Sequence, residues 1–372
     1  MIASNIERRF RNLVRSDTRL KNAYLLVRSD ALDVHVHIAE GHSDMLDVHQ
    51  PNHLASVGKL FTATLIGILC EEGKLRYDDP IARFLDVELM DGLHVCKGVD
   101  YSDRIKVRHL LMQTSGLNDV FYELYRRMVR DETFRPTTRD AVLWGKEHLK
   151  PVARPGRRHY YTDTNYYLLG FIIERVTGKW FHEALRAYLF EPLGMDTAYA
   201  HGFEHPRSKL PTSGAYVDGI DLLSVEGIHE IDYAGGSVVA PLEEYLLFFE
   251  ALVEGRIIGE DTLRTMIEDD VYMGFPTMGF RYGYSIWKPV SVPFIMPRTY
   301  WCWGCVGVTG AFMFYHPPTG SYVIGSFNEF AYRGKALDFM FRNVVGELVR
   351  GQRAAVRAGS RRALSANRSE YR

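Results

Sequence analysis

Cysteine is scarce in this chain, and the positive and negative charges of the chain nearly cancel. The 372 residues include only four cysteines, Cys70, Cys96, Cys302 and Cys305. At this length so few cysteines do not make a disulfide framework. The formal net charge is −1, so no electrostatic attraction to nucleic acid or to an acidic membrane surface is expected. We therefore predict neither as a partner.

Two of the cysteines, Cys302 and Cys305, form a Cys-x-x-Cys motif that suggests redox or metal chemistry. If this segment is a strand, however, the odd spacing sends the two side chains to opposite faces. No second pair of cysteines or histidines completes a zinc site in the sequence. His35 and His37 share a strand face as a metal pair would, but we favour solvent-facing histidines. We therefore expect no metal and no organic cofactor.

Long apolar runs are also missing. No stretch is long enough to span a bilayer, and residues 1–10 carry charge where a signal peptide needs an apolar core. We therefore expect a cytoplasmic protein without a membrane partner, while a removed leader peptide stays open. The composition, with 46% hydrophobic and 13% aromatic residues, is that of a globular chain with a sizeable core.

Strand patterns lie at the two ends of the chain, with helical patterns between them. We expect strands at residues 23–27, 34–38, 282–287, 310–315 and 321–327, and a turn at 234–241. We expect helices at residues 5–14, 56–72, 105–117, 143–149, 164–176, 180–188, 242–252 and 336–349. This order predicts an α+β fold, in which strands from both ends share one antiparallel sheet flanked by helices.

The same pattern predicts the domain organisation. Residues 1–75 and 234–350 would form the two parts of an α/β domain, and residues 76–233 would form an inserted, mostly helical domain. Residues 351–372, rich in Arg, Ala and Ser, are expected to be a flexible tail. No internal repeat or low-complexity linker separates these parts.

The strongest local signal for chemistry is Ser56-Val57-Gly58-Lys59 at the start of an apolar helix. Residues three apart share a helix face, so Ser56 and Lys59 would project side by side. Burial disfavours the ammonium form and is expected to lower the pKa of Lys59. The pair would then act as nucleophile and base, as in the Ser-x-x-Lys signature of serine hydrolases. The same four residues also fit an N-capping serine followed by a solvated lysine.

A second segment, residues 155–170, makes the catalytic interpretation more specific. Together with Ser-x-x-Lys it resembles the penicillin-recognising serine hydrolases: class C β-lactamases, D-alanyl-D-alanine carboxypeptidases and the esterases that share their β-lactamase/transpeptidase-like fold. That family pairs Ser-x-x-Lys with Tyr-x-Asn, and here Tyr161-Thr162-Asp163 takes that place. Further flanks match at residues 108–111, 114–117, 191–195 and 234–236, and the resemblance covers about residues 20–350.

The resemblance implies a role for each of these residues. Ser56 would be the acylated nucleophile, and Lys59 and Tyr161 would relay its proton. The phenol would hand the proton to the leaving group, with Lys59 holding it partly ionised. Tyr160 is the rival for this role, but the motif alignment selects Tyr161. Asp163 keeps an acceptor near Lys59 but adds a negative charge, which would raise the lysine pKa.

The third family motif is where this chain departs from the pattern. The family places Lys-Thr-Gly, or His-Ser-Gly in the esterases, on the strand that lines the site, and here the alignment gives Cys305-Val306-Gly307. Backbone N–H groups of Ser56 and Val308 would still form an oxyanion hole. The cation and the hydroxyl that hold a substrate carboxylate are gone, at a cost of about 1.5–3 kcal/mol for one lost charge-assisted contact.

We therefore predict an esterase-like serine hydrolase that cleaves a small ester or amide with an uncharged acyl group. Acyl transfer through the same acyl-enzyme is a related possibility. The motifs are also compatible with a β-lactamase or carboxypeptidase that recruits Arg281 or Arg298, and with a non-catalytic binding protein. Aromatic residues near the third motif would form an acyl pocket or simply pack the core: Tyr300, Trp301, Trp303 and Phe312. No prediction follows for the natural substrate or the oligomeric state.

Overall fold

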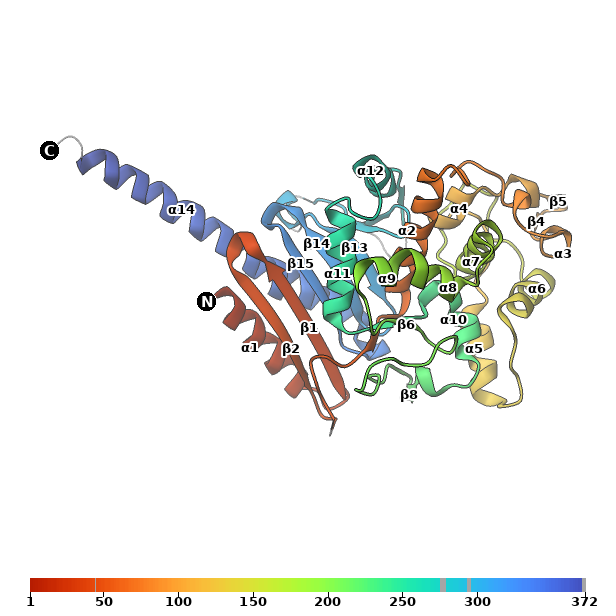
Figure 1. Cartoon of the computed structure of the whole chain (residues 1–372), viewed down its shortest axis with the longest axis horizontal. Coiled ribbons are helices and arrows are strands. Elements are labelled where there is room, and N and C mark those ends of the chain that lie inside the picture. Colours follow the sequence, from red (N-terminus) through yellow and green to blue (C-terminus); the bar gives the residue numbers. More distant parts are fainter. Residues whose placement is uncertain (44, 275–278, 293–295, 370–372) are drawn as a thin grey trace.

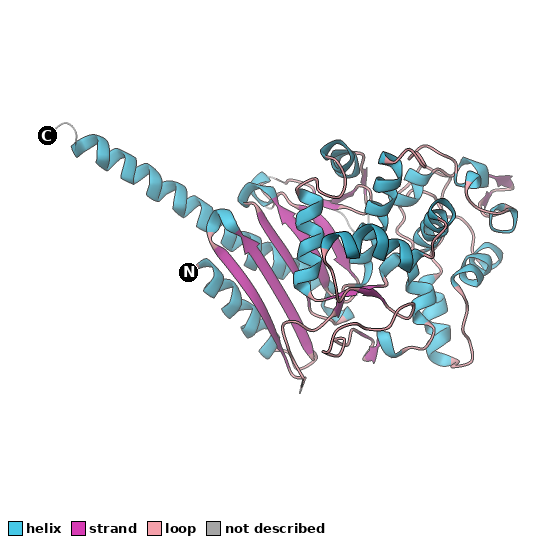
Figure 2. Ribbon diagram, in the orientation of Figure 1, coloured by secondary structure: helices cyan, strands magenta, loops and turns pink. Residues whose placement is uncertain are grey.

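The centre of the molecule is an antiparallel sheet. The computed structural model describes residues 1–43, 45–274, 279–292 and 296–369, and its largest sheet has eight strands in the order β10-β11-β12-β13-β14-β15-β1-β2 (Figures 1 and 2). These strands are β1 (Asn22–Ser29), β2 (Val34–Gly41), β10 (Val271–Tyr272), β11 (Phe280–Tyr282), β12 (Trp287–Pro289), β13 (Trp303–Gly307), β14 (Ala311–His316) and β15 (Ser321–Ser326).

The two ends of the chain meet in this sheet. Strand β1 pairs with β15 in a register that sets Leu26 opposite Ile324, and β1 and β2 form the expected N-terminal hairpin. The turn after His316 joins β14 and β15 as the second expected hairpin. The predicted α+β fold, with strands from both ends in one antiparallel sheet, is confirmed.

Helices from the two chain ends cover one face of the sheet. Helix α1 (Ile2–Arg15) places Ile6, Phe10 and Val14 on one side at helical spacing, and all three are buried against that face. Helix α13 (Arg333–Phe339), the π-helical turn η10 (Met340–Val345) and α14 (Gly346–Ser369) pack beside it. Residues 351–369, predicted as a tail, lie in α14, which extends past the end of the sheet (Figure 1).

The other face of the sheet packs against α2 (Gly58–Glu71) and α11 (Leu242–Val253) and, beyond them, the helical region (Figure 2). The remaining helices are α3 (Val87–Met90), α4 (Val107–Leu111), α5 (Phe121–Arg130), α6 (Thr138–His148), α7 (Thr164–Thr177), α8 (Phe181–Leu185), π-helical η5 (Arg186–Phe190), α9 (Glu191–Leu193), α10 (Ile228–Gly236) and α12 (Glu260–Glu268). Short strands complete this part: β3 (Asn52–His53), β4 (Val95–Cys96), β5 (Val99–Asp100), β6 (Tyr199–Ala200), β7 (Tyr216–Val217), β8 (Ile220–Asp221) and β9 (Val238–Ala240).

Two predicted elements are wrong. Residues 282–287 do not form one strand, because the chain reverses between β11 and β12: the Gly283 N–H donates to the Ile286 carbonyl at 2.8 Å, and Ser285 has a φ of +62°. Residues 234–241 are not a simple turn either. They contain the end of α10 and strand β9, which pairs with β3 and β6.

No helix among the described residues is both long enough and apolar enough to cross a bilayer.

Candidate active site

Ser56 lies where the chain enters the buried helix α2. It belongs to a 3₁₀ turn, η2 (Ala55–Val57), that leads directly into that helix. Ala55 has a φ of +49°, which is costly for a residue with a side chain and is tolerated where the surroundings enforce it. Ser56 lines a pocket of about 970 Å³, so this local strain accompanies an accessible serine hydroxyl.

Lys59 lies beside Ser56, as the three-residue spacing predicts. Its Nζ donates to Ser56 Oγ at 3.0 Å and to the Gly235 carbonyl at 2.8 Å, and it forms an ion pair with Asp163. The side chain is only 2% exposed. Three acceptors therefore surround one buried amine, which is the number that an ammonium group can serve.

The lack of a side chain at Gly235 explains why the end of α10 lies so close to Lys59 and Asp163. A Cβ atom there would stand 3.0 Å from Asp163 Oδ1 and 3.3 Å from Lys59 Nζ. The absence of a side chain thus lets the α10 backbone accept a hydrogen bond from Lys59. The Ala-Gly-Gly flank at residues 234–236 serves this close approach.

Tyr161 is the second group beside the serine. Both residues line the pocket, Ser56 acts on the Tyr161 phenol in the direction that lowers its pKa, and Lys59 Nζ lies 5.3 Å from the centre of the tyrosine ring. Burial, with the Asp163 charge, holds the Tyr161 pKa well above its usual value, which favours the neutral phenol over the partly ionised one expected from the sequence. Tyr160 instead donates to Asn118 Oδ1 at 3.0 Å. The geometry thus places Tyr161, and not Tyr160, at the serine.

Behind Lys59 lies a pair of carboxyl groups. Asp163 forms the ion pair with Lys59, and its backbone N–H donates to Asp119 Oδ1 at 2.8 Å. Burial, followed by the charge of Asp163, raises the pKa of Asp119 to about 7. Asp119 was not identified from the sequence, although it comes two residues after the matching flank at 114–117. Two carboxyl groups therefore lie together behind the Lys59 amine.

Strand β13 and the residue after it form the opposite wall. Val306, Gly307 and Val308 line the pocket, whereas the Cys305 thiol is buried and donates to the Ser285 carbonyl at 2.7 Å. A Cβ atom at Gly307 would come within 2.2 Å of the Leu54 carbonyl oxygen, so glycine is required there. At the third motif, the side chain that lines the pocket is therefore that of Val306.

The two cysteines of the Cys-x-x-Cys motif lie in separate parts of the core. Cys302 is buried in the cluster that includes α1, and Cys305 is buried in the cluster that includes α2. Both thiols are free, and burial raises the pKa of each well above its usual value. This is the arrangement expected from their odd spacing on a strand.

Aromatic and apolar side chains make up much of the pocket wall, but they are not the ones proposed from the sequence. Trp303 and Phe312 are buried in the core, and Tyr300 and Trp301 are not among the lining residues. The pocket is lined by Phe121, Tyr122, Leu222, Met273, Phe280, Trp287, Val306 and Leu337. These residues come from widely separated parts of the chain, and no short motif would have identified them.

Two arginines line the pocket, and again they differ from the predicted ones. Arg158 and Arg333 lie in its wall. Arg281 pairs with Asp270, and neither it nor Arg298 is part of the lining. The only sequence signal that could have identified Arg158 is its position three residues before Tyr161.

Comparison with known proteins places this site in a family. The Beta-lactamase family model matches residues 46–346. The chain therefore belongs to the β-lactamase family of hydrolases.

Individual relatives cover a range of chemistry. Penicillin-binding protein 4* of Bacillus subtilis is 30% identical over 44% of this chain and 35% of its own length. ML-236A carboxylate methylbutanoyltransferase mlcH of Penicillium citrinum is 30% identical over 60% of this chain and 57% of its own length. The matched segment thus spans less than two thirds of either relative.

A solved structure supports the fold over nearly the whole chain. D-amino acid amidase from Ochrobactrum anthropi SV3, complexed with L-phenylalanine amide, is 22% identical with a TM-score of 0.76. The match covers 95% of this chain and 99% of the amidase.

Proposed function

We propose that this protein is a serine hydrolase that cleaves a small ester or amide through an acyl-Ser56 intermediate. The observation that carries the proposal is one serine hydroxyl that accepts a hydrogen bond from Lys59 and lies beside Tyr161 at the wall of a pocket. A nucleophile with two adjacent proton-transfer groups is the arrangement that covalent catalysis needs.

The proposed reaction has two halves, acylation of Ser56 and hydrolysis of the acyl-enzyme, and each group acts once in each half. Ser56 Oγ attacks the substrate carbonyl carbon, and its proton passes to Lys59, which accepts it as the neutral amine and later returns a proton to Tyr161. The neutral phenol of Tyr161 donates a proton to the leaving group. Water then attacks the acyl-Ser56 ester with the same groups in reverse order, and the acid is released. Backbone N–H groups of Ser56 and Val308, both in the pocket wall, would stabilise the oxyanion.

We propose an ester or amide with an apolar acyl group as the substrate. Support comes from the aromatic and aliphatic pocket wall and from Val306, which stands where the family has a hydroxyl-bearing residue. The transferase and amidase relatives indicate that acyl groups other than β-lactams are handled on this fold. Cytoplasmic action is part of the same proposal.

A second candidate is hydrolysis of a substrate that carries a carboxylate, as a β-lactam does. The observation that favours it is the presence of Arg158 and Arg333 in the pocket wall. Guanidinium groups bind carboxylates with two parallel hydrogen bonds.

One assay separates the two candidates. Hydrolysis of p-nitrophenyl butyrate and of nitrocefin is measured for the wild type and for Ser56→Ala. We expect butyrate hydrolysis that falls by about 10³-fold or more in Ser56→Ala, and little nitrocefin turnover. Nitrocefin turnover that matches the ester would favour the second candidate. A lack of Ser56-dependent turnover of either substrate would contradict both and support a binding protein.

A further inference from the structure

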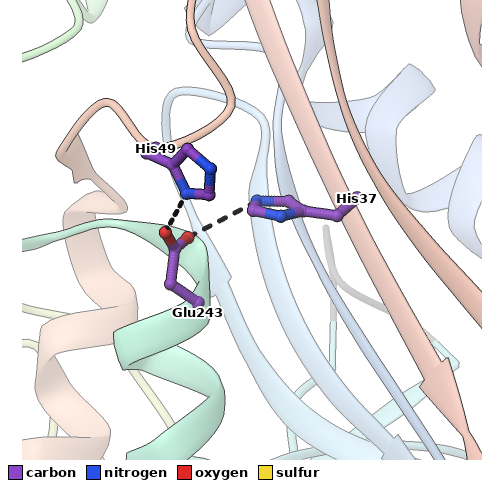
Figure 3. A group of neighbouring side chains, drawn as sticks. All are labelled: His37, His49 and Glu243. Carbon is purple, nitrogen blue, oxygen red and sulfur yellow. Dashed lines mark hydrogen bonds and ion pairs between the residues drawn. The ribbon is translucent and has the colours of Figure 1, made fainter.

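A group of metal-binding side chains lies away from the catalytic pocket. His37 comes from β2, His49 from the turn that precedes β3, and Glu243 from the first turn of α11 (Figure 3). One ligand atom from each residue lies within 4.8 Å of the other two. None of the three lines the pocket that contains Ser56. Two neighbouring segments of the chain and the start of α11, 194 residues after His49, therefore converge on one point.

Two polar atoms in this cluster have no hydrogen-bond partner. His37 Nε2 and Glu243 Oε2 are both buried without one, and they face each other at 3.4 Å. Most buried polar atoms in native proteins are satisfied, so two such atoms in one place call for an explanation.

A cation between these two atoms would satisfy both at once. An imidazole nitrogen and a carboxylate oxygen are both ligands of divalent transition-metal ions.

We propose that His37, His49 and Glu243 bind one divalent transition-metal ion, with Zn²⁺ as the best match. Two imidazole nitrogens and a carboxylate are a recurrent zinc ligand set. Ligand atoms of a tetrahedral zinc site, at about 2.0–2.1 Å from the metal, lie roughly 3.3 Å from one another. The separation between His37 Nε2 and Glu243 Oε2 already matches this value.

The surroundings fit a site with one open position. The His49 side chain is 61% exposed and the Glu243 side chain 38% exposed, so water can reach the ion as a fourth ligand. His49 donates to or accepts from Glu243 at 2.5 Å, and metal binding would replace that contact and release its proton.

The ion would act as a clamp and not as a catalyst. It would join the edge strand β2 and helix α11 to the segment that runs from His49 into Ser56, seven residues later. Binding to the folded state alone stabilises it in proportion to the logarithm of ligand over Kd. At a free Zn²⁺ concentration 100-fold above Kd, we expect the Tm to rise by about 3 °C.

Zinc binding to the full chain tests this proposal directly. Protein stripped with a chelator is dialysed against a Zn²⁺ buffer, and bound metal is counted by atomic absorption. We expect one equivalent for the wild type and at least a tenfold weaker affinity in His49→Ala and Glu243→Gln. His49→Ala is the decisive variant because the residue is exposed and its loss leaves the core intact. At that Zn²⁺ concentration the Tm rise should fall to about half or less in the same variants.

Two control variants keep the result specific. His35→Ala removes an exposed histidine two residues from His37 on the same strand, and Ser56→Ala removes the nucleophile. Both should bind one equivalent and show the full Tm shift. The proposal is overturned if the wild type holds well under one equivalent, or if His49→Ala and Glu243→Gln bind zinc as tightly as the wild type does.

Discussion

At the scale of single residues, the account depends on which tyrosine serves Ser56. Tyr161 lies beside Ser56 and Lys59 in the pocket, whereas Tyr160 bonds Asn118. Removal of a positioned proton-transfer group costs about 10²–10⁴-fold in rate. We expect Tyr161→Phe to lower kcat/KM for p-nitrophenyl butyrate by about 10²-fold or more, and Tyr160→Phe to change it only a few-fold. Equal losses in the two variants would show that the relay is assigned to the wrong residue.

Asp119 gives a prediction about pH and stability. Its pKa rises from 3.8 to about 7 because of burial and the charge of Asp163. Between these values the folded protein binds a proton that the unfolded chain has released, so stability falls as the pH rises through this window. Because asparagine does not titrate, Asp119→Asn removes this loss of stability at high pH. The Tm of the variant relative to the wild type should therefore be higher at about pH 8 than at about pH 5.

Differential scanning fluorimetry at the two pH values checks this prediction. The matched control is Asp103→Asn, an exposed aspartate, whose effect on Tm should be the same at both. A Tm difference for Asp119→Asn that does not change with pH would mean that Asp119 carries no extra proton in the folded state.

The sequence identifies residues whose spacing is local and misses those that folding brings in. Ser56 and Lys59 are three apart on one helix face, and Tyr161 stands in a motif, so all three could be placed before the structure. Asp119, Arg333 and Trp287 reach the pocket from separate elements. No local pattern reports such contacts, because they depend on how the elements pack.

At the scale of elements, the site depends on the close contact between β13 and the turn that holds Ser56. A Cβ atom at Gly307 would lie 2.2 Å from the Leu54 carbonyl oxygen, and backbone cannot yield as a flexible side chain can. Overpacking of this kind costs about 1–3 kcal/mol. We expect Gly307→Ala to lower the free energy of unfolding by at least that amount in urea denaturation, and to reduce ester hydrolysis.

Gly334→Ala provides the comparison for stability. Its Cβ would meet no atom within 4 Å, and alanine favours the helix that contains it. This variant should be as stable as the wild type or slightly more so. If the two substitutions destabilise the protein equally, the contact between β13 and Leu54 is looser than described.

Elements are predicted well where a periodic pattern is long and poorly where a turn interrupts it. Helices α1, α2 and α7 and the hairpin of β14 and β15 follow their apolar periodicity. The alternating residues 282–287 read as one strand, yet they contain the reversal at Gly283 and Ser285. Ser285 adopts a positive φ in which its N–H bonds the distant Leu111 carbonyl, and no rule of local propensity predicts that.

At the scale of the whole molecule, helix α1 lies away from the site. None of its residues lines the pocket, although α13 on the same face of the sheet contributes Arg333, Gly334 and Leu337. Helix α1 packs into a buried core on that face. Phe10 is fully buried there, with ring centroids 5.7 Å from Phe327 and 5.8 Å from Phe339. Loss of such a ring costs about 3–5 kcal/mol. We expect Phe10→Ala to lose that stability yet keep its kcat/KM when assayed well below its Tm.

Urea denaturation and ester hydrolysis together check this separation. The control is Arg8→Ala, on the exposed side of the same helix, which should change stability by less than about 0.5 kcal/mol. A large fall in kcat/KM for folded Phe10→Ala would show that the α1 face is coupled to the site.

The central claim is that Ser56 becomes covalently acylated. Its most direct test is to treat the protein with a fluorophosphonate probe and to locate the adduct by mass spectrometry of its peptides. The account predicts one adduct per chain, on the peptide that contains Ser56, strongly slowed in Lys59→Ala and absent from Ser56→Ala. A folded wild-type protein that stays unlabelled, or an adduct that persists in Ser56→Ala, would contradict it.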